Sequence, residues 1–255
     1  MRFAVCVKHA IDETELKIDS GGKPQVEGAA GKMSTFDKNA VEESLRLRSA
    51  KTGEVVAITV GAPDSKKTLK EALAMGVDKG VAVSADLLST DTLRTAELLA
   101  AAITKTGPYD IVICSEGSSD TYDGQVPPML GELLGLPYVG YARRIEIDGG
   151  SVKVERSLED TLESVETSLP LVVSVVSEIN EPRYPTLIQI MQSSKKSVED
   201  FNGEQLVQLG TRKQSYVVSM AAQSPSRKHI MIEGTPDQAA AKLVEALSKE
   251  GVLLK

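Results

Sequence analysis

The stretch EVVAITVGAPDSKKTLKEALAMGVDKGVAVS, residues 54–84, decides the fold. Its two ends, residues 54–61 and 79–84, are apolar and rich in β-branched residues, as strands buried on both faces are. The segment between them, residues 64–76, has apolar residues at helical spacing and closes on Gly76, a residue type that commonly ends helices. A strand, a helix and a second strand in this order predict a parallel pair joined by a crossover helix.

The same alternation continues on both sides of this unit. Further strands are predicted at residues 2–8, 109–115 and 169–177, and further helices at residues 35–53 and 89–107. We therefore predict an α/β fold with a doubly wound, mostly parallel sheet. After Pro137, residues 140–170 alternate polar and apolar side chains around a DGG turn, which predicts an antiparallel hairpin with a third strand.

Composition excludes several classes of protein. The chain has 255 residues, 41% of them hydrophobic, and a net charge of -7, so it can bury a sizeable core but lacks the positive charge of a general nucleic-acid binder. No run approaches the ~20 apolar residues that cross a bilayer, and the start MRFAVCVKHA turns polar too soon for a secretory signal. We expect a cytoplasmic protein that neither binds nucleic acid nor inserts into a membrane.

Cysteine and histidine are scarce. Cys6 and Cys114 are the only cysteines, and His9 and His229 are the only histidines. Neither cysteine belongs to a CxxC pair, and both fall in strand-like runs, where buried structural thiols are the usual case. We therefore expect no metal site.

The pattern changes after residue 197. The remainder has no clear period until Thr235 and Pro236, which fit the N-cap and first turn of an amphipathic helix. We interpret residues 1–197 as one α/β domain and residues 198–255 as an arm that packs on another protein.

Ligands of a parallel sheet bind beyond the carboxyl ends of its strands, where loops meet helix N-termini. No GxGxxG pattern follows the first strand, which disfavours a standard dinucleotide site. Residues 34–37, before the first helix, fit either helix capping or ligand binding. Residues 61–65 fit either an ordinary turn or contact with an adenosine.

The long polar loop at residues 115–126 is the strongest candidate for a ligand site. It ends at Pro127 and Pro128, which fit the first turn of a helix because their missing N–H groups would be unbonded there. The open N–H groups and the helix dipole at residues 124–126 then predict an anion site, such as one for a nucleotide phosphate. The alternative is a loop without a ligand.

Asp120 and Asp123 in this loop are candidates for paired carboxylates. No His, Lys or Cys stands beside them in a nucleophile pattern, and the GxxxxGK[ST] spacing of phosphate-binding loops is absent. Solvated or capping carboxylates are the favoured interpretation, and we predict no catalytic residue.

Residues 178–196, EINEPRYPTLIQIMQSSKK, present apolar side chains at short intervals in a polar loop. Such a stripe usually packs inward, whereas an exposed one marks an interaction site. Pro182 and Pro185 restrict the backbone just before Leu187, so we interpret Leu187 as exposed on a stiff loop.

Four stretches carry a resemblance to a known family: VCVKHAID (5–12), ALAMG (72–76), SEGSSDTYDGQVPPMLGELLGLP (115–137) and NEPRYPTLIQIM (180–191). Over essentially its whole length the chain resembles the β subunits of electron-transfer flavoproteins, and the last stretch is close to the signature of that family. The resemblance implies an adenine-nucleotide α-hydrolase-like fold and an electron-carrier role without an independent catalytic site. It also implies pairing with an α subunit, on which residues 198–255 would pack.

The resemblance implies cofactors as well. In this family the α subunit holds most contacts to an FAD. The β subunit binds an AMP of structural role or, in electron-bifurcating members, a second FAD that accepts hydride from NADH. Pro127 stands where bifurcating relatives tend to have glycine, which favours AMP. By position, the nucleotide contacts fall on Cys6, Ser34, Thr35, Phe36, Asp37, Ser65, Ser115, Asp120, Asp123, Gly124, Gln125 and Val126.

The implied partners are acyl-CoA or related dehydrogenases as electron donors, and a membrane quinone oxidoreductase as an acceptor. The residues implied to recognise a partner are Pro182, Arg183, Tyr184, Leu187, Ile190 and Met191, with Leu187 as the anchor. Two alternatives stay open: an electron-bifurcating subunit with a second FAD, and a stand-alone ATP-binding or ATP-hydrolysing protein of the same fold.

Overall fold

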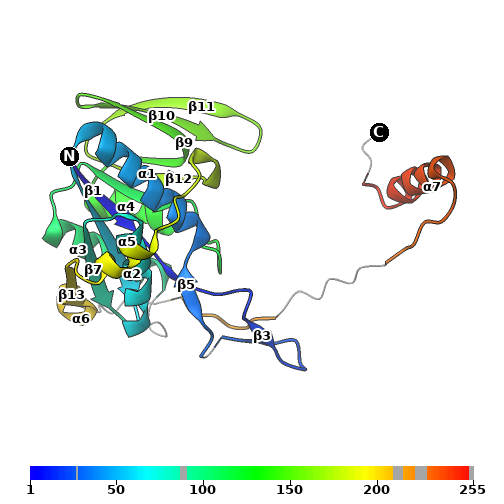
Figure 1. The fold of residues 1–255 in the computed structure, drawn as a ribbon, viewed down its shortest axis with the longest axis horizontal. Coiled ribbons are helices and arrows are strands. Elements are labelled where there is room, and N and C mark those ends of the chain that lie inside the picture. The colour runs from blue at the N-terminus through cyan, green and yellow to red at the C-terminus, as the bar shows by residue number, and fades with distance from the viewer. Residues whose placement is uncertain (27, 87–90, 209–214, 222–228, 253–255) are drawn as a thin grey trace.

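The structure is a computed structural model that describes residues 1–26, 28–86, 91–208, 215–221 and 229–252. In these residues one nine-stranded sheet forms the centre, in the order β11-β10-β9-β12-β8-β1-β6-β7-β13 (Figure 1). Its strands are β1 (Arg2–Cys6), β6 (Glu54–Gly61), β7 (Lys79–Ser84), β8 (Ile111–Ser115), β9 (Tyr138–Asp148), β10 (Ser151–Ser157), β11 (Leu162–Ser168), β12 (Leu171–Val175) and β13 (Val198–Asn202).

Helices and short strands surround this sheet. The helices are α1 (Thr35–Lys51), α2 (Lys66–Met75), α3 (Thr92–Thr106), α4 (Val126–Leu134), α5 (Leu187–Ser193), α6 (Gly203–Leu206) and α7 (Pro236–Lys249), with 3-10 turns η1 (Pro63–Ser65) and η3 (Ser177–Ile179). The short strands are β2 (His9–Ile11), β3 (Lys17–Ile18), β4 (Pro24–Gln25) and β5 (Gly31–Met33).

The predicted fold class is confirmed. From β9 to β13 neighbouring strands run parallel, whereas β9, β10 and β11 pair antiparallel and form the expected hairpin with its third strand. Because successive strand residues point to opposite faces, Phe3 and Val5 enter one apolar core while Ala4 and Cys6 enter the other. The first core lies under α1 and α2, and the second lies under α3 and α4, so the sheet is covered on both faces.

The strand order reverses at β1. The chain passes from β1 to β6 and β7 on one side, and then returns to β8 on the other side of β1. A crevice opens at such a switch point because the two connections leave in opposite directions, and ligands of open α/β sheets bind there. A ligand site is therefore expected at the carboxyl ends of β1 and β8.

The structure differs from the expected start of the arm at residue 198. Val198–Asn202 forms β13, the edge strand beside β7, and Phe201, Leu206 and Val207 pack on the second core. The α/β body thus reaches Val207. Sequence periodicity missed this strand because an edge strand keeps several polar residues.

The helix expected near the C-terminus is present as α7. Thr235 occupies the N-cap and forms a capping box with Gln238, and Pro236 lies in the first turn. None of the residues of α7 is buried, and Figure 1 shows the helix apart from the α/β body.

Candidate functional site

Side chains from three elements meet at the switch point. Ser115 ends β8, Lys8 follows β1, and Ser34 and Asp37 lie at the start of α1. Ser34 stands at the N-cap of α1 but does not cap it; its hydroxyl accepts the N–H of Ser119 at 3.2 Å. This serine therefore holds the polar loop against the start of α1 instead of capping the helix.

Asp37 is the buried centre of this cluster. The Lys8 N–H donates to its Oδ2 at 2.6 Å, and Ser115 Oγ lies 2.5 Å from its Oδ1. Ser115 Oγ also lies 2.8 Å from the carbonyl oxygen of Gly117. A hydroxyl has one hydrogen to donate: when Asp37 is ionised Ser115 donates it to Asp37, and when Asp37 is protonated the carboxyl group can donate to Ser115, whose hydrogen is then available for the Gly117 carbonyl.

The electrostatics agree with a protonated Asp37. Burial raises the pKa of its carboxyl to about 7, although the hydrogen bonds from the Lys8 N–H and from Ser115 act to lower it. The carboxyl group is therefore close to half protonated at neutral pH.

Lys8 holds the polar loop in place and was missed by sequence reasoning. Its Nζ donates to Asp120 at 2.7 Å and to the hydroxyls of Ser118 and Thr121 at 3.2 Å each. Burial is the largest influence and acts to raise the pKa of Asp120, but the hydrogen bonds from Lys8, Ser118 and the Ile11 N–H, together with the charge of Lys8, outweigh it and the pKa is lowered. The only sequence feature that could have indicated Lys8 is its position just after the central strand β1.

The start of α4 has the features of an anion site. The N–H groups of Gly124, Gln125 and Val126 donate to no other described residue, and Pro127 and Pro128 follow in the first turn. Nearby in the same loop, Ser119 Oγ is buried and lacks a hydrogen-bond partner among the described residues. Open donors beside the positive end of a helix dipole fit a phosphate group.

The remaining loop residues have different surroundings. The ring of Phe36 contacts that of Tyr122, with centroids 5.4 Å apart, and Thr35 is exposed. Asp123 is exposed as well, and no described contact joins it to Asp120. The two carboxylates therefore do not form a pair in this structure.

Cys6 lies in the apolar core on the far side of β1 from Phe3 and Val5. Its side chain enters the second core beside Cys114, and a hydrogen bond with Cys6, together with burial, raises the pKa of the Cys114 thiol. Both thiols are buried, as expected.

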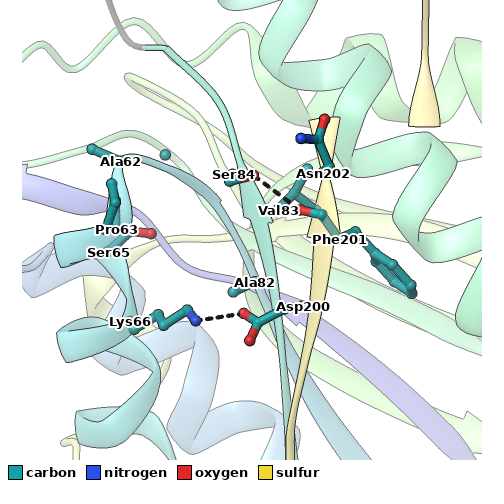
Figure 2. Close-up of a pocket in the computed structure, with 11 residues that line it drawn as sticks. Ala62, Pro63, Ser65, Lys66, Ala82, Val83, Ser84, Asp200, Phe201 and Asn202 are labelled. Carbon is teal, nitrogen blue, oxygen red and sulfur yellow. Dashed lines mark hydrogen bonds and ion pairs between the residues drawn. The ribbon is translucent and has the colours of Figure 1, made fainter. Parts of the chain in front are cut away.

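Ser65 lies apart from the cluster around Asp37, at another point along the edge formed by the carboxyl ends of the strands. It is buried and lines a pocket of about 340 Å³ between η1 and the ends of β6, β7 and β13. Figure 2 shows this pocket, where Lys66 forms an ion pair with Asp200 and Ser84 donates to the Phe201 carbonyl. No described hydrogen bond joins Ser65 to the cluster around Asp37.

The apolar residues that α5 contributes to the segment 178–196 are exposed, whereas Ile179 packs partly buried against the first core. α5 displays Leu187, Ile188, Ile190 and Met191, the first of them 80% exposed, and the expectation of an exposed Leu187 is confirmed for this chain. Tyr184 is exposed too, and Pro182 is partly buried.

Arg183 is held from within the chain. Its guanidinium donates to both carboxylate oxygens of Glu42 on α1, at 2.6 and 2.7 Å. No sequence pattern indicated Glu42 as the partner of Arg183, because the two residues lie far apart in the chain.

The chain is similar to known proteins over most of its length. A family model described as the electron transfer flavoprotein domain matches residues 25–206. The chain is 34% identical to the electron transfer flavoprotein subunit beta of Thermoanaerobacterium thermosaccharolyticum over 99% of this chain and 100% of that protein. It is 31% identical to the Bacillus subtilis protein of that name over the full length of both. Its identity to the Clostridium acetobutylicum protein of that name is 35%, over 81% of this chain and 80% of that protein.

The described residues show neither a membrane-spanning helix nor a metal-binding cluster. Among these residues no helix has both the length and the apolar character needed to span a bilayer. They also contain no group of three or more His, Cys, Asp and Glu side chains arranged to hold a metal ion.

Proposed function

The chain belongs to the electron transfer flavoprotein family, among its β subunits, and from this premise we propose that it pairs with an α subunit to carry electrons from acyl-CoA or related dehydrogenases. The α subunit would make most of the contacts to an FAD. This flavin supplies the electron-carrying chemistry when bound. A membrane quinone oxidoreductase is the proposed acceptor. The polar groups at the switch point and at the start of α4 would bind an adenine nucleotide, and AMP is the favoured candidate.

The observation that carries this proposal is the exposed arm. Apolar side chains of the arm lie open to solvent: Val217, Val218, Ile230, Met231, Leu243 and Val244. α7 is amphipathic and capped, yet none of its residues is buried. Helices of this length gain most of their stability from packing, so the arm fits a subunit that is completed by another chain.

Coexpression with the α subunit tests the proposal. A yellow heterodimer that is reduced by an acyl-CoA dehydrogenase supports it. Denaturing the heterodimer and identifying the released nucleotides by mass would distinguish AMP from a second FAD. A colourless monomer that hydrolyses ATP would contradict the proposal.

The residues at the switch point fit an adenine nucleotide. The N–H groups of residues 124–126 would hold the phosphate, and the Ser119 hydroxyl, which has no partner in the described part of the chain, gives a further donor. The raised pKa of Asp37 reduces the buried negative charge at this edge of the sheet, which suits a nucleotide phosphate. These residues bind and orient the nucleotide, and we assign none of them a catalytic step.

Gly124→Val is expected to reduce nucleotide retention about tenfold. Gly124 has φ +64°, a conformation that is strained for β-branched residues, and an added Cβ would lie 3.0 Å from the Glu116 carbonyl oxygen. The resulting shift would move the N–H donors at the start of α4. The measurement is nucleotide released per chain after denaturation.

Gly135→Val is the matched control, since Gly135 also has φ +64° and lies at the other end of α4, with no atom within 4 Å of an added Cβ. It should lose stability while keeping its nucleotide. Full nucleotide content in the Gly124 variant would show that the phosphate lies elsewhere.

Ending the chain at Gln208 is expected to abolish pairing with the α subunit. This truncation removes the part of the arm that lies beyond the α/β body. It keeps β13 and the core contacts of Phe201 and Val207, so the α/β body should melt near the wild-type temperature. Size-exclusion chromatography of the coexpressed subunits measures pairing. A chain ending at Ser197 is the contrast, because it also loses β13 and should melt lower. A stable, yellow heterodimer from the chain ending at Gln208 would refute the assignment of the arm.

A further inference from the structure

The segment between β12 and β13, residues 176–197, crosses the face of the sheet that α1 and α2 cover. At its start it is fixed to α1 by a reciprocal pair of amides. Asn39 Nδ2 donates to the carbonyl oxygens of Ser177 and Asn180 at 2.9 Å each. Asn180 Nδ2 donates back to the Asn39 carbonyl oxygen at 3.0 Å.

Glu42, one helical turn further along α1, forms a second attachment. Its carboxylate accepts two hydrogen bonds from the Arg183 guanidinium and a third from the Arg183 N–H at 3.2 Å. Burial is the largest influence and acts to raise the pKa of Glu42, but the hydrogen bonds from Arg183, together with the charges of Arg183 and Arg46, outweigh it and the pKa is lowered. A two-pronged contact of this kind fixes direction as well as distance.

The other end of the segment is fixed to α2. Lys196 Nζ donates to the carbonyl oxygens of Leu73 and Val77 at 2.9 and 2.6 Å, where α2 ends. Gly80 then donates to the Ser197 carbonyl oxygen at 2.9 Å, which leads into β13. The exposed apolar side chains of α5 lie between these two sets of attachments.

We propose that Asn39, Glu42 and Lys196 are positioning residues for partner docking. Asn39 and Glu42 hold the segment from α1, and Lys196, which belongs to the segment, holds it to the end of α2. Together they fix how α5 is presented, whereas α5 itself contacts the partner. Arg183 acts through Glu42 in this scheme. The inference rests on the proposed function, because docking through α5 is part of it.

A double-mutant cycle in the heterodimer tests the attachment at Glu42. With a purified acyl-CoA dehydrogenase as electron donor, Glu42→Ala and Arg183→Ala should each raise the KM for the heterodimer about threefold to tenfold while kcat stays unchanged. The double variant should be no worse than either single one. Glu146→Ala, which removes an exposed ion pair with Arg144 on β9, is the matched control and should leave KM unchanged.

Two kinetic outcomes would overturn the inference. Unchanged KM in both single variants would show that the attachment does not position α5. A further rise in KM when Arg183→Ala is added to Glu42→Ala would show that Arg183 contacts the partner directly.

Amide hydrogen exchange gives an independent measurement on the heterodimer alone. Exchange across residues 187–193 should be faster in Glu42→Ala and in Lys196→Met, and unchanged in Leu187→Ala. If the dehydrogenase does not reduce the wild-type heterodimer, the proposed donor is wrong, and hydrogen exchange alone decides the positioning role. Wild-type exchange in both attachment variants would contradict that role.

Discussion

Leu187→Ala is expected to raise the KM of a partner dehydrogenase for the heterodimer about tenfold to a hundredfold. A leucine side chain that becomes buried contributes roughly 1.5 to 3 kcal/mol, and each 1.4 kcal/mol is about a factor of ten in affinity. Leu187 is exposed in this chain, at the first position of α5. The variant should therefore keep wild-type flavin, nucleotide and thermal stability.

The local structure explains why one side chain can have so large an effect. Thr186 and Gln189 form a capping box that fixes the first turn of α5, and the attachments to Glu42 and Lys196 hold the segment on both sides. Little conformational freedom remains to be lost on docking, so most of the burial energy appears as affinity.

Leu162→Ala is the matched control for this variant. Leu162 is an exposed leucine at the start of β11, remote in the fold from α5, and its replacement should leave electron transfer unchanged. Wild-type KM in Leu187→Ala would place the anchor elsewhere. Loss of flavin or of folding in that variant would identify Leu187 as a structural residue.

Asp37→Asn is expected to remove a pH dependence of stability that the wild type shows. Because the pKa of Asp37 is about 7 in the folded chain, against an ordinary value of 3.8, the folded state holds a proton that the unfolded state releases. The free energy of unfolding should fall as pH rises from about 4 to about 7, by up to about 4 kcal/mol, and then level off. Denaturant titration at several pH values measures this slope.

Asparagine reproduces the hydrogen bonds of the protonated acid. Its oxygen accepts the Lys8 N–H, and its amide donates to Ser115, whose own hydrogen remains available for Gly117. Asp37→Asn should thus be more stable than the wild type above pH 7 and equally stable near pH 4. A wild-type slope in the variant would show that another group titrates.

Asp120→Asn provides the opposite sign. The pKa of Asp120 is lowered by Lys8, so its stabilising contribution is present above its ordinary pKa and is lost as pH falls through the lowered value. Replacing it should therefore destabilise the protein at neutral pH and leave the acid range little changed.

The fold was largely predictable because its central strands are buried on both faces. β1, β6, β7, β8 and β12 are continuous apolar runs, and the helices between them have clear end signals. The two small sheets within residues 9–33 were missed, since their strands are two or three residues long. β13 was missed because its partner β7 lies more than a hundred residues earlier and its own sequence, VEDFN, is mostly polar.

The site was predictable only where strand ends determine it. Asp37 and Ser115 were expected, because the carboxyl ends of neighbouring parallel strands meet at one edge. The protonation of Asp37 follows from burial and from a shared hydroxyl, which no local pattern encodes. Lys8 and Glu42 depend on how loops return to the sheet, and therefore only the structure shows their partners.

The path of residues 176–197 also limits how the protein can change partners. β12 and β13 are five strands apart, or ~24 Å, and the segment must cover that distance while returning to the opposite end of the sheet. Adding or removing a residue would shift α5 along α1 and α2 or pull β13 from its edge. Substitutions on the exposed side of α5 change neither the position of this helix nor the pairing of β13. New docking specificity is therefore expected to arise through substitutions at constant length, with the segment acting as a fixed frame for a variable surface.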